Sequence, residues 1–125
     1  MLVPDTSSFI AYLEGESGPD VDAVEGALRD EVLLMAPPVV AELLSEPTLS
    51  EEARSWILAL PMLPIREGFW ERVGLLRARI ISRGCKARLA DSLIVQVCLD
   101  HEAQLVARDQ DFTVFEKYAS LNLLS

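Results

Sequence analysis

Residues 89–111 read LADSLIVQVCLDHEAQLVARDQD, and this stretch indicates the fold class most directly. Positions 89–101 are strongly apolar and long enough to predict a buried helix rather than a strand. Positions 104–107 then predict a short buried strand, which Asp109 and Asp111 follow. A buried helix that leads into a buried strand is typical of an α/β fold.

The same alternation continues through the rest of the chain. Short apolar runs that stop at proline or polar residues predict further strands at 1–3, 32–36, 62–65 and 121–124. Helical spacing of apolar residues, with plausible caps, predicts helices at 6–15, 20–29, 38–46, 50–60, 70–83 and 112–118. We therefore expect a three-layer α/β/α sandwich with a mostly parallel central sheet of four to five strands.

The composition fits one domain, which we expect to span residues 1–125. Of the 125 residues, 50% are hydrophobic, enough for a core without metal or disulfide staples. No apolar run approaches the ~20 residues of a membrane helix. Pro4 and Asp5 directly follow the first three residues, so we expect no secretory signal peptide and a cytoplasmic protein without membrane contacts.

Charge is distributed unevenly along the chain. The net charge is −9, which argues against a protein that coats nucleic acid by charge alone. The window from Arg66 to Arg88, however, contains seven basic and two acidic residues, a net of +5. Two interpretations stay open for this window: a solvated helix face, or a surface that meets a polyanion.

Asp91 stands out among the acidic residues. On a helix it falls between Ile94, Val95 and Cys98, on an apolar face. The polar residues of the same helix form a separate stripe at Ser92, Gln96 and Asp100. A buried carboxylate is costly unless it is paired or binds a cation. The alternative is an acid in the first helical turn that interacts with the helix dipole.

Four further acids are predicted at strand ends or helix starts. Asp5 ends the first strand, Asp109 and Asp111 follow the strand at 104–107, and Glu42 interrupts an apolar run. Each alone has an ordinary explanation as a helix cap or loop acid. Together with Asp91 they are expected on one rim, where their charges would repel without a cation. Oxygen ligands without Cys or His suit Mg²⁺ or Mn²⁺, which indicates phosphoryl chemistry.

These motifs resemble those of PIN-domain nucleases. The resemblance rests on Asp5-Thr6-Ser7 with Phe9-Ile10, on Glu42 within 39–43, on the LADSLI segment at 89–94 and on the ARDQDF segment at 107–112. The motifs occur in the expected order over essentially the whole chain. They are most similar to those of the VapC toxins of bacterial toxin–antitoxin pairs.

The resemblance implies a metal-dependent endoribonuclease that hydrolyses RNA with Mg²⁺ or Mn²⁺. It implies that an acidic quartet holds the metal and carries catalysis: Asp5, Glu42, Asp91 and Asp109, with Asp111 as an auxiliary metal ligand. Ala107 departs from the family, which commonly has Thr there, so one hydroxyl near Asp109 is missing. Ser7 is placed to orient Asp5 or water, and Ser7, Lys86 and Arg88 are the expected substrate contacts.

The resemblance also implies a homodimer and a cognate antitoxin that covers the active site. The segment 49–63 offers the apolar residues for such a partner helix, namely Leu49, Trp56, Ile57, Leu60 and Met62. Ile57 and Leu60 are instead expected in the core. For Trp56 and Trp70, a position in the core and a position at an interface both stay open.

Two alternatives lie outside catalysis: a PIN domain that only binds partners, and a receiver-like Mg²⁺-binding signalling module. A receiver needs paired acids after the first strand and a lysine after a late strand, whereas Asp5 stands alone here and Lys117 is the only later lysine. Serine-hydrolase chemistry is not indicated, because the sequence contains no G-x-S-x-G elbow. The single histidine, His101, is expected to be solvated at a helix end.

Overall fold

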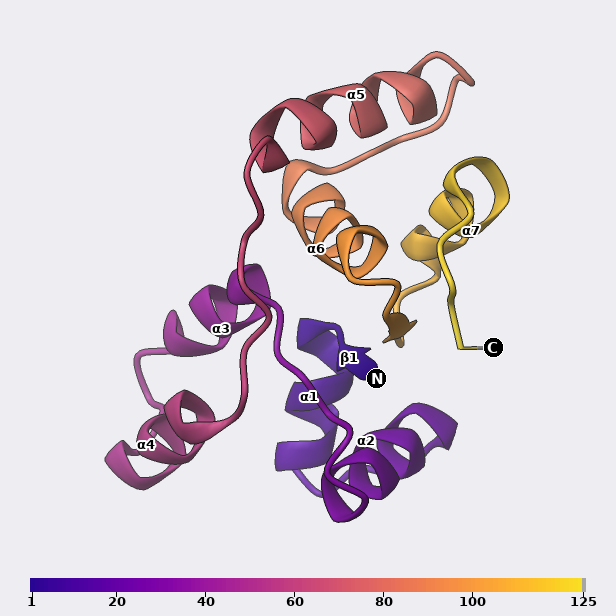
Figure 1. The fold of residues 1–125 in the computed structure, drawn as a ribbon. Helices are drawn as coiled ribbons and strands as arrows, with labels where there is room; N and C mark the ends of the chain where they lie inside the picture. The colour runs from indigo at the N-terminus through magenta and orange to yellow at the C-terminus, as the bar shows by residue number, and fades with distance from the viewer. Residues whose placement is uncertain (125) are drawn as a thin grey trace.

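The computed structural model describes residues 1–124. Two short strands, β1 (Leu2–Pro4) and β2 (Gln104–Val106), pair in parallel. Figure 1 shows β1 near the middle of the molecule. Val3 lies opposite Leu105 and Pro4 opposite Val106, and both Val3 and Leu105 are fully buried. This pairing brings the first residues of the chain beside residues a hundred positions later.

The helices agree closely with the sequence prediction. In chain order they are α1 (Thr6–Leu13), α2 (Pro19–Arg29), α3 (Pro37–Leu44), α4 (Glu51–Ala59), α5 (Phe69–Ile81), α6 (Leu89–Asp100) and α7 (Thr113–Ala119), with a 3₁₀ turn, η1 (Gln110–Phe112), before α7. The side chains of Asp5 and Ser50 cap α1 and α4, while Pro37 begins α3. Among residues 1–124, none of these helices is long and apolar enough to cross a bilayer.

The predicted sheet of four to five strands is wrong in extent. Only β1 and β2 form a ladder within residues 1–124. The other predicted strands make single parallel bridges, at Leu2 with Leu33, Met35 with Met62, and Leu105 with Leu123. Prolines flank the bridging positions at 37, 61 and 64, and proline cannot donate a ladder hydrogen bond. Five parallel segments therefore lie in the expected places, but three of them are too short to count as strands.

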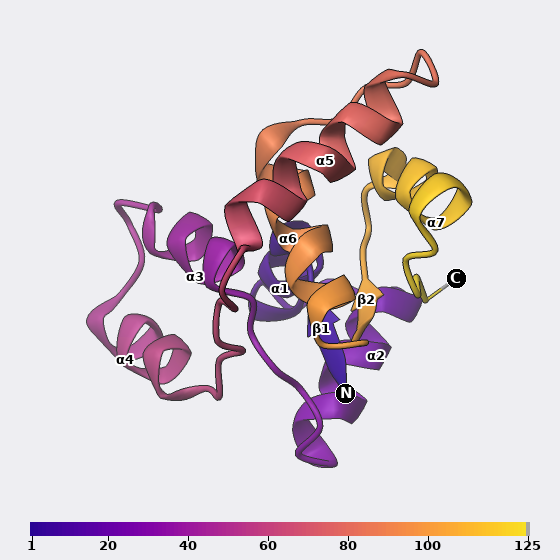
Figure 2. The ribbon, with the colours of Figure 1, turned by 45° about the horizontal axis from the view of Figure 1, so that its top comes forward.

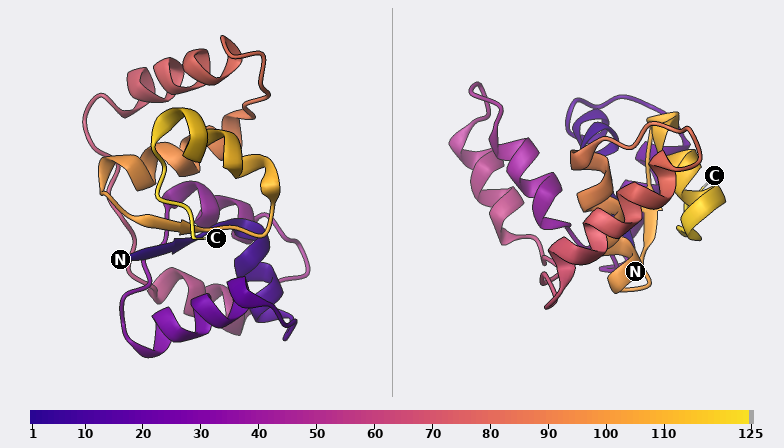
Figure 3. Two further views of the ribbon diagram at one scale, coloured as in Figure 1. Left: turned by 90° about the vertical axis from the view of Figure 1, so that its right-hand side faces the viewer. Right: turned by 90° about the horizontal axis from the view of Figure 1, so that it is seen from above.

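Helices cover both faces of the paired strands. Figure 2 shows β1 and β2 side by side, with α3 and α4 on one flank and α7 on the other. Figure 3 (left) shows α1 and α2 below the strands, and α6 and α7 above them with α5 farther out. Phe9, Phe112 and Val95 are buried between these layers.

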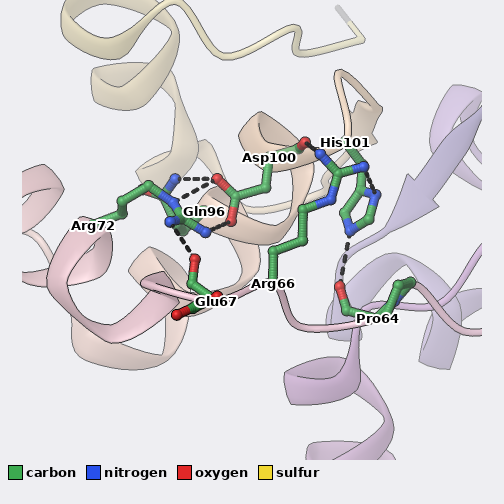
Figure 4. Close-up of polar contacts among 7 residues, drawn as sticks. All are labelled: Pro64, Arg66, Glu67, Arg72, Gln96, Asp100 and His101. Carbon is green, nitrogen blue, oxygen red and sulfur yellow. Dashed lines mark hydrogen bonds and ion pairs between the residues drawn. The ribbon is translucent and has the colours of Figure 1, made fainter.

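A polar network fixes α5 against the end of α6 (Figure 4). Arg72 donates to both carboxylate oxygens of Asp100, at 2.9 and 2.7 Å, and Gln96 donates to the same carboxylate at 2.8 Å. Burial alone would raise the pKa of Asp100, but these hydrogen bonds outweigh it and hold the pKa below its usual value. The start of α5 is thereby bonded to the end of α6, the next helix in the chain.

His101 belongs to the same network. It is the C-cap of α6, as predicted, but it is half-buried and hydrogen-bonded within the protein rather than freely solvated. Its Nε2 lies 2.8 Å from the carbonyl oxygen of Pro64 and its Nδ1 lies 3.2 Å from Arg66. Arginine can only donate, so Nδ1 accepts and Nε2–H donates to the carbonyl. The ring thus ties the segment before α5 to the end of α6.

Candidate functional site

Asp5 is placed by the end of β1 and the start of α1. Its backbone N–H donates to Val106 of β2 at 2.8 Å, so it lies at the carboxyl edge of both strands. One carboxylate oxygen accepts from the Ser8 amide and the other from the Ser7 hydroxyl, each at 2.8 Å. Burial raises the pKa of Asp5, and these hydrogen bonds offset part of the effect. Only 3% of the residue is exposed.

Glu42 reaches the same edge from α3. The Thr6 hydroxyl donates to its carboxylate at 2.7 Å, which places Glu42 beside the residue that follows Asp5. Although Glu42 interrupts an apolar run in the sequence, its side chain is exposed. Its apolar neighbours Val40 and Leu43 turn toward the core instead.

Asp91 occupies the first turn of α6 and carries the most perturbed carboxylate of the site. Burial raises its pKa to about 6, and nearby negative charges act in the same direction, while Arg88 opposes them. The acids that exert this effect, in decreasing order, are Asp109, Asp111 and Glu42. Since such effects require short range, Asp91 lies within electrostatic reach of three of the other predicted site residues.

Asp109 and Asp111 come from the loop after β2. The Asp109 carboxylate accepts from the Asp111 amide at 2.9 Å and thereby caps η1. Both side chains are exposed. Because Asp5 and Asp109 follow two paired parallel strands, these two acids lie at the same edge of the sheet. Glu42 is joined to this edge through Thr6, and Asp91 is within electrostatic reach of Glu42, Asp109 and Asp111; we call this edge the acidic rim.

The donor chemistry of this rim fits a hard divalent cation. Every candidate ligand is a carboxylate oxygen, the donor that Mg²⁺ and Mn²⁺ prefer. Burial raises the pKa of Asp91, and the neighbouring acids raise it further. Within residues 1–124, however, no three acidic, His or Cys side chains lie close enough together to hold one ion as they stand. Asp91 is thus within electrostatic range of Glu42, Asp109 and Asp111, but no three of the described acids are within coordination distance of one ion.

Basic side chains lie beside these acids. A cleft of about 120 Å³ is lined by Asp91 and Asp111 together with Lys86 and Arg88. Arg88 is 3.9 Å from the Asp111 carboxylate. Of the basic window, Arg66, Arg72 and Arg77 are held by internal hydrogen bonds, so only part of that charge faces outward.

Arg108 is a site residue that sequence reasoning missed. Its guanidinium bonds both carboxylate oxygens of Asp20, at 2.9 and 3.1 Å, and also reaches Glu16 and the Ser17 carbonyl. These bonds tie the loop after β2, just before Asp109, to the start of α2. Gly18 fits here because it has φ +147° and a Cβ would lie 2.7 Å from an Asp20 oxygen. The partners are 88 to 92 positions away, so no local pattern indicates them.

A larger groove of about 650 Å³ opens next to Glu42, between α1, α3 and the start of α4. Its apolar lining includes Ile10 and Leu13, both more than a third exposed, and Leu49. Of the apolar residues expected in 49–63, Ile57 is buried and Trp56 stacks on Phe9 at 5.8 Å. Only the first part of that segment therefore lines the groove.

Comparison with known proteins gives one family and several related structures. A family model described as PIN domain matches residues 2–119. The sequence has no significant match among curated proteins. The fold is similar to FitAcB from Neisseria gonorrhoeae, with 22% identity and a TM-score of 0.77 over 100% of this chain and 97% of that chain.

Two further relatives come from complexes. VapBC2 from Rickettsia felis, crystallised with a DNA fragment from its promoter, has 18% identity and a TM-score of 0.76, covering 98% of this chain and 96% of that chain. VapBC-5 from Mycobacterium tuberculosis, a member of the VapBC family of toxin-antitoxin systems, has 20% identity and a TM-score of 0.58, covering 74% and 80%. At these identities the likeness concerns the fold.

Proposed function

This chain belongs to the PIN-domain family, and from that premise we propose that it is a metal-dependent endoribonuclease that hydrolyses RNA phosphodiester bonds. PIN domains are generally metal-dependent nucleases. The observation that carries the proposal is the crowding of negative charge around Asp91, whose pKa is raised by burial and by the neighbouring acids.

The acidic rim would hold the cation, Mg²⁺ or Mn²⁺. Its ligands would come from Asp5, Glu42, Asp91 and Asp109, with Asp111 as an auxiliary acid. A bound divalent cation supplies Lewis-acid chemistry, activating water and neutralising charge on the phosphodiester. Ser7 and Thr6 fix the carboxylates of Asp5 and Glu42 by hydrogen bonds, so the chain orients two ligands in advance.

Cleavage of RNA by the purified protein tests the proposal. We expect cleavage with Mg²⁺ or Mn²⁺ and none with excess chelator or in Asp91→Asn. Cleavage that survives in the variant would contradict the assignment. A PIN domain that only binds partners, or a receiver-like module, predicts no metal-dependent cleavage by the wild-type protein.

Lys86 and Arg88 would contact substrate phosphates beside the acids. In Lys86→Ala/Arg88→Ala we expect weaker RNA binding at low salt and a salt dependence of log K reduced by roughly 1.4, about 0.7 for each lost contact to single-stranded RNA. Filter binding over a range of salt concentrations measures this. Arg29→Ala, which removes a charge paired with the adjacent Asp30, should leave the slope unchanged. An unchanged slope in the double variant would refute the contacts.

Arg108 would position the loop that carries Asp109. Arg108→Ala removes the two bonds to Asp20, so we expect a small fall in the urea concentration at half-unfolding, as for other solvent-exposed ion pairs. We also expect cleavage to fall about tenfold. Arg108→Lys should recover only part of either loss, because lysine cannot bond both oxygens in fork geometry. Urea unfolding and cleavage rates at saturating RNA measure the two effects, and wild-type rates in Arg108→Ala would exclude a positioning role.

We further propose that the protein is the toxin of a toxin–antitoxin pair and a homodimer. A helix of the antitoxin would occupy the groove beside Glu42, with a basic side chain directed to the acids. Ile10→Asp/Leu13→Asp should then keep RNA cleavage but lose inhibition by a co-expressed candidate antitoxin. Inhibition as strong as that of the wild type would place the antitoxin elsewhere.

A further inference from the structure

Positive charge near the acidic rim is left without acidic partners. The chain has 20 acidic residues for 11 basic ones, so carboxylates are plentiful. Within residues 1–124, Arg83, Lys86 and Lys117 are nevertheless exposed and form no salt bridge. Cations without a partner on the protein are free to bind an anion from outside, such as a phosphate.

Two of these cations meet at one aromatic ring. The guanidinium carbon of Arg83 and Nζ of Lys117 each lie 5.1 Å from the centre of the Tyr118 ring. Arg83 comes from the turn after α5 and the other two residues come from α7. Cation–π attraction to the half-buried ring holds both charges in place. We call these three residues the Tyr118 cluster. Its two positive charges repel each other, and a bound anion would offset that repulsion.

The Tyr118 cluster lies beyond the cleft that contains Asp91 and Asp111. Val114 of α7 lines this cleft. Lys117 follows Val114 by three positions and Tyr118 follows it by four, so all three share one face of α7. Tyr118 is about 6 Å farther along the helix axis than Val114. One face of α7 therefore leads from the two acids to the cluster.

The connection between α5 and α6 follows the same direction. Lys86 lines the cleft with the acids, and Arg83 precedes it by three residues. The helix that ends just before Arg83, α5, packs against α7, and Figure 2 shows the end of α5 beside that helix. The two segments thus border one path, which carries positive charge from the cleft to the Tyr118 cluster.

This arrangement bears on the two interpretations of the basic window from Arg66 to Arg88. A merely solvated helix face would scatter its free charges over the surface. Here Arg83 and Lys86 instead line up with Lys117, which lies outside the window and comes from another helix. A continuous row of cations beside a candidate catalytic site suits the backbone of a single-stranded nucleic acid.

We propose that the Tyr118 cluster is a second phosphate-binding site, which holds the RNA strand on one side of the bond to be cut. The proposal rests on the proposed ribonuclease function for its substrate. Arg83 and Lys117 would each contact a phosphate, a short distance along the strand from those that meet Lys86 and Arg88. The Tyr118 ring would keep both cations in position.

Binding of labelled single-stranded RNA, measured by fluorescence anisotropy with excess chelator, tests the site without cleavage. At about 50 mM salt, Arg83→Ala/Lys117→Ala should raise the Kd on the order of tenfold or more, and the salt dependence of log K should fall by roughly 1.4. Arg29→Ala/Arg54→Ala is the matched control, because it changes the net charge equally at two residues that already have acidic partners. It should keep the wild-type slope.

An unchanged Kd and slope in Arg83→Ala/Lys117→Ala would overturn the proposal, as would equal losses in the control variant or a wild type that binds no RNA at low salt. Circular dichroism shows that the variants fold. Tyr118→Phe should bind like the wild type, because the attraction needs only the ring, whereas Tyr118→Leu should raise the Kd about twofold to fivefold. Equal weakening in both Tyr118 variants would exclude the role of the ring.

Cleavage of RNAs of increasing length separates this proposal from the nuclease proposal. With Mg²⁺, an RNA long enough to reach the Tyr118 cluster should have a lower KM than a short one. Arg83→Ala/Lys117→Ala should remove this advantage and leave kcat at saturating RNA unchanged. A wild type that cleaves without any gain from length would overturn the second site alone. A wild type that shows the expected binding but no cleavage would overturn the nuclease proposal and leave the phosphate site standing.

Discussion

Replacing Asp91 with asparagine should abolish RNA cleavage and, at the same time, stabilise the metal-free protein at pH 7. The pKa of Asp91 is raised to about 6 from 3.8. A carboxylate with a raised pKa in the folded state destabilises the fold increasingly between these two pH values and fully above pH 6. The shift bounds the gain at about 3 kcal/mol. Because solvent screens a partly exposed group, we expect on the order of 1 kcal/mol.

The loss of activity should be large, on the order of 10³-fold, because a missing ligand removes several kcal/mol of transition-state stabilisation. Thermal unfolding with and without Mg²⁺ separates the two roles of Asp91. Added Mg²⁺ should raise the melting temperature of the wild type above pH 6, and should raise that of Asp91→Asn much less.

Asp22→Asn is the matched control, because Asp22 is also a first-turn helix acid but is exposed. Loss of its favourable interaction with the helix dipole should slightly destabilise the protein and leave cleavage intact. If the only role of Asp91 were to interact with the dipole of α6, Asp91→Asn would slightly destabilise the protein and leave cleavage intact, as expected for Asp22→Asn. A destabilised, active Asp91→Asn would therefore contradict the metal-site assignment.

The helices and the family could be predicted from the sequence because both depend on patterns among residues that are close together in the chain. Apolar spacing and caps such as Asp5 and Ser50 set the helix positions, and the match of the PIN-domain model confirms the family that the motifs indicated. The extent of the sheet could not be predicted in this way. A run such as 32–36 has the composition of a strand, but its bridges depend on partners far away, at Leu2 and Met62.

The buried polar groups were the hardest to predict. Ser92 and Gln96 form part of the polar stripe of α6, yet they are 0% and 6% exposed. Ser92 donates back to the Arg88 carbonyl, and Gln96 is satisfied by Asp100. Asp100 in turn depends on Arg72 from α5. Helical periodicity separates polar from apolar faces but cannot show which polar face is covered by another helix.

For the candidate site, the sequence indicated which acids to inspect but not how they are held. Asp91 could be singled out by its place on an apolar face, and Asp5 and Asp109 by their positions after strands. The hydrogen bond from the Thr6 hydroxyl to Glu42 and the bonds from Arg108 to Asp20 could not be predicted in this way. Both are contacts between side chains more than thirty positions apart, and they depend on the tertiary fold.

Asp5→Ala should also abolish cleavage but, unlike Asp91→Asn, should destabilise the protein, by about 2 kcal/mol. Alanine removes the cap of α1, and the buried Ser8 amide and the Ser7 hydroxyl lose their acceptor. Urea unfolding at pH 7 measures the loss of stability, and cleavage assays with Mg²⁺ measure the loss of activity.

Asp5→Asn separates the structural role of Asp5 from its proposed catalytic role. The asparagine carbonyl still accepts from the Ser8 amide and so keeps the cap. Burial raises the pKa of Asp5, so the folded protein disfavours its charge at pH 7, and removal of the charge should leave stability within about 1 kcal/mol of the wild type. Cleavage should nevertheless be lost, because the amide supplies one neutral oxygen in place of a carboxylate. An Asp5→Asn protein that cleaves RNA at the wild-type rate would show that Asp5 serves only as a helix cap.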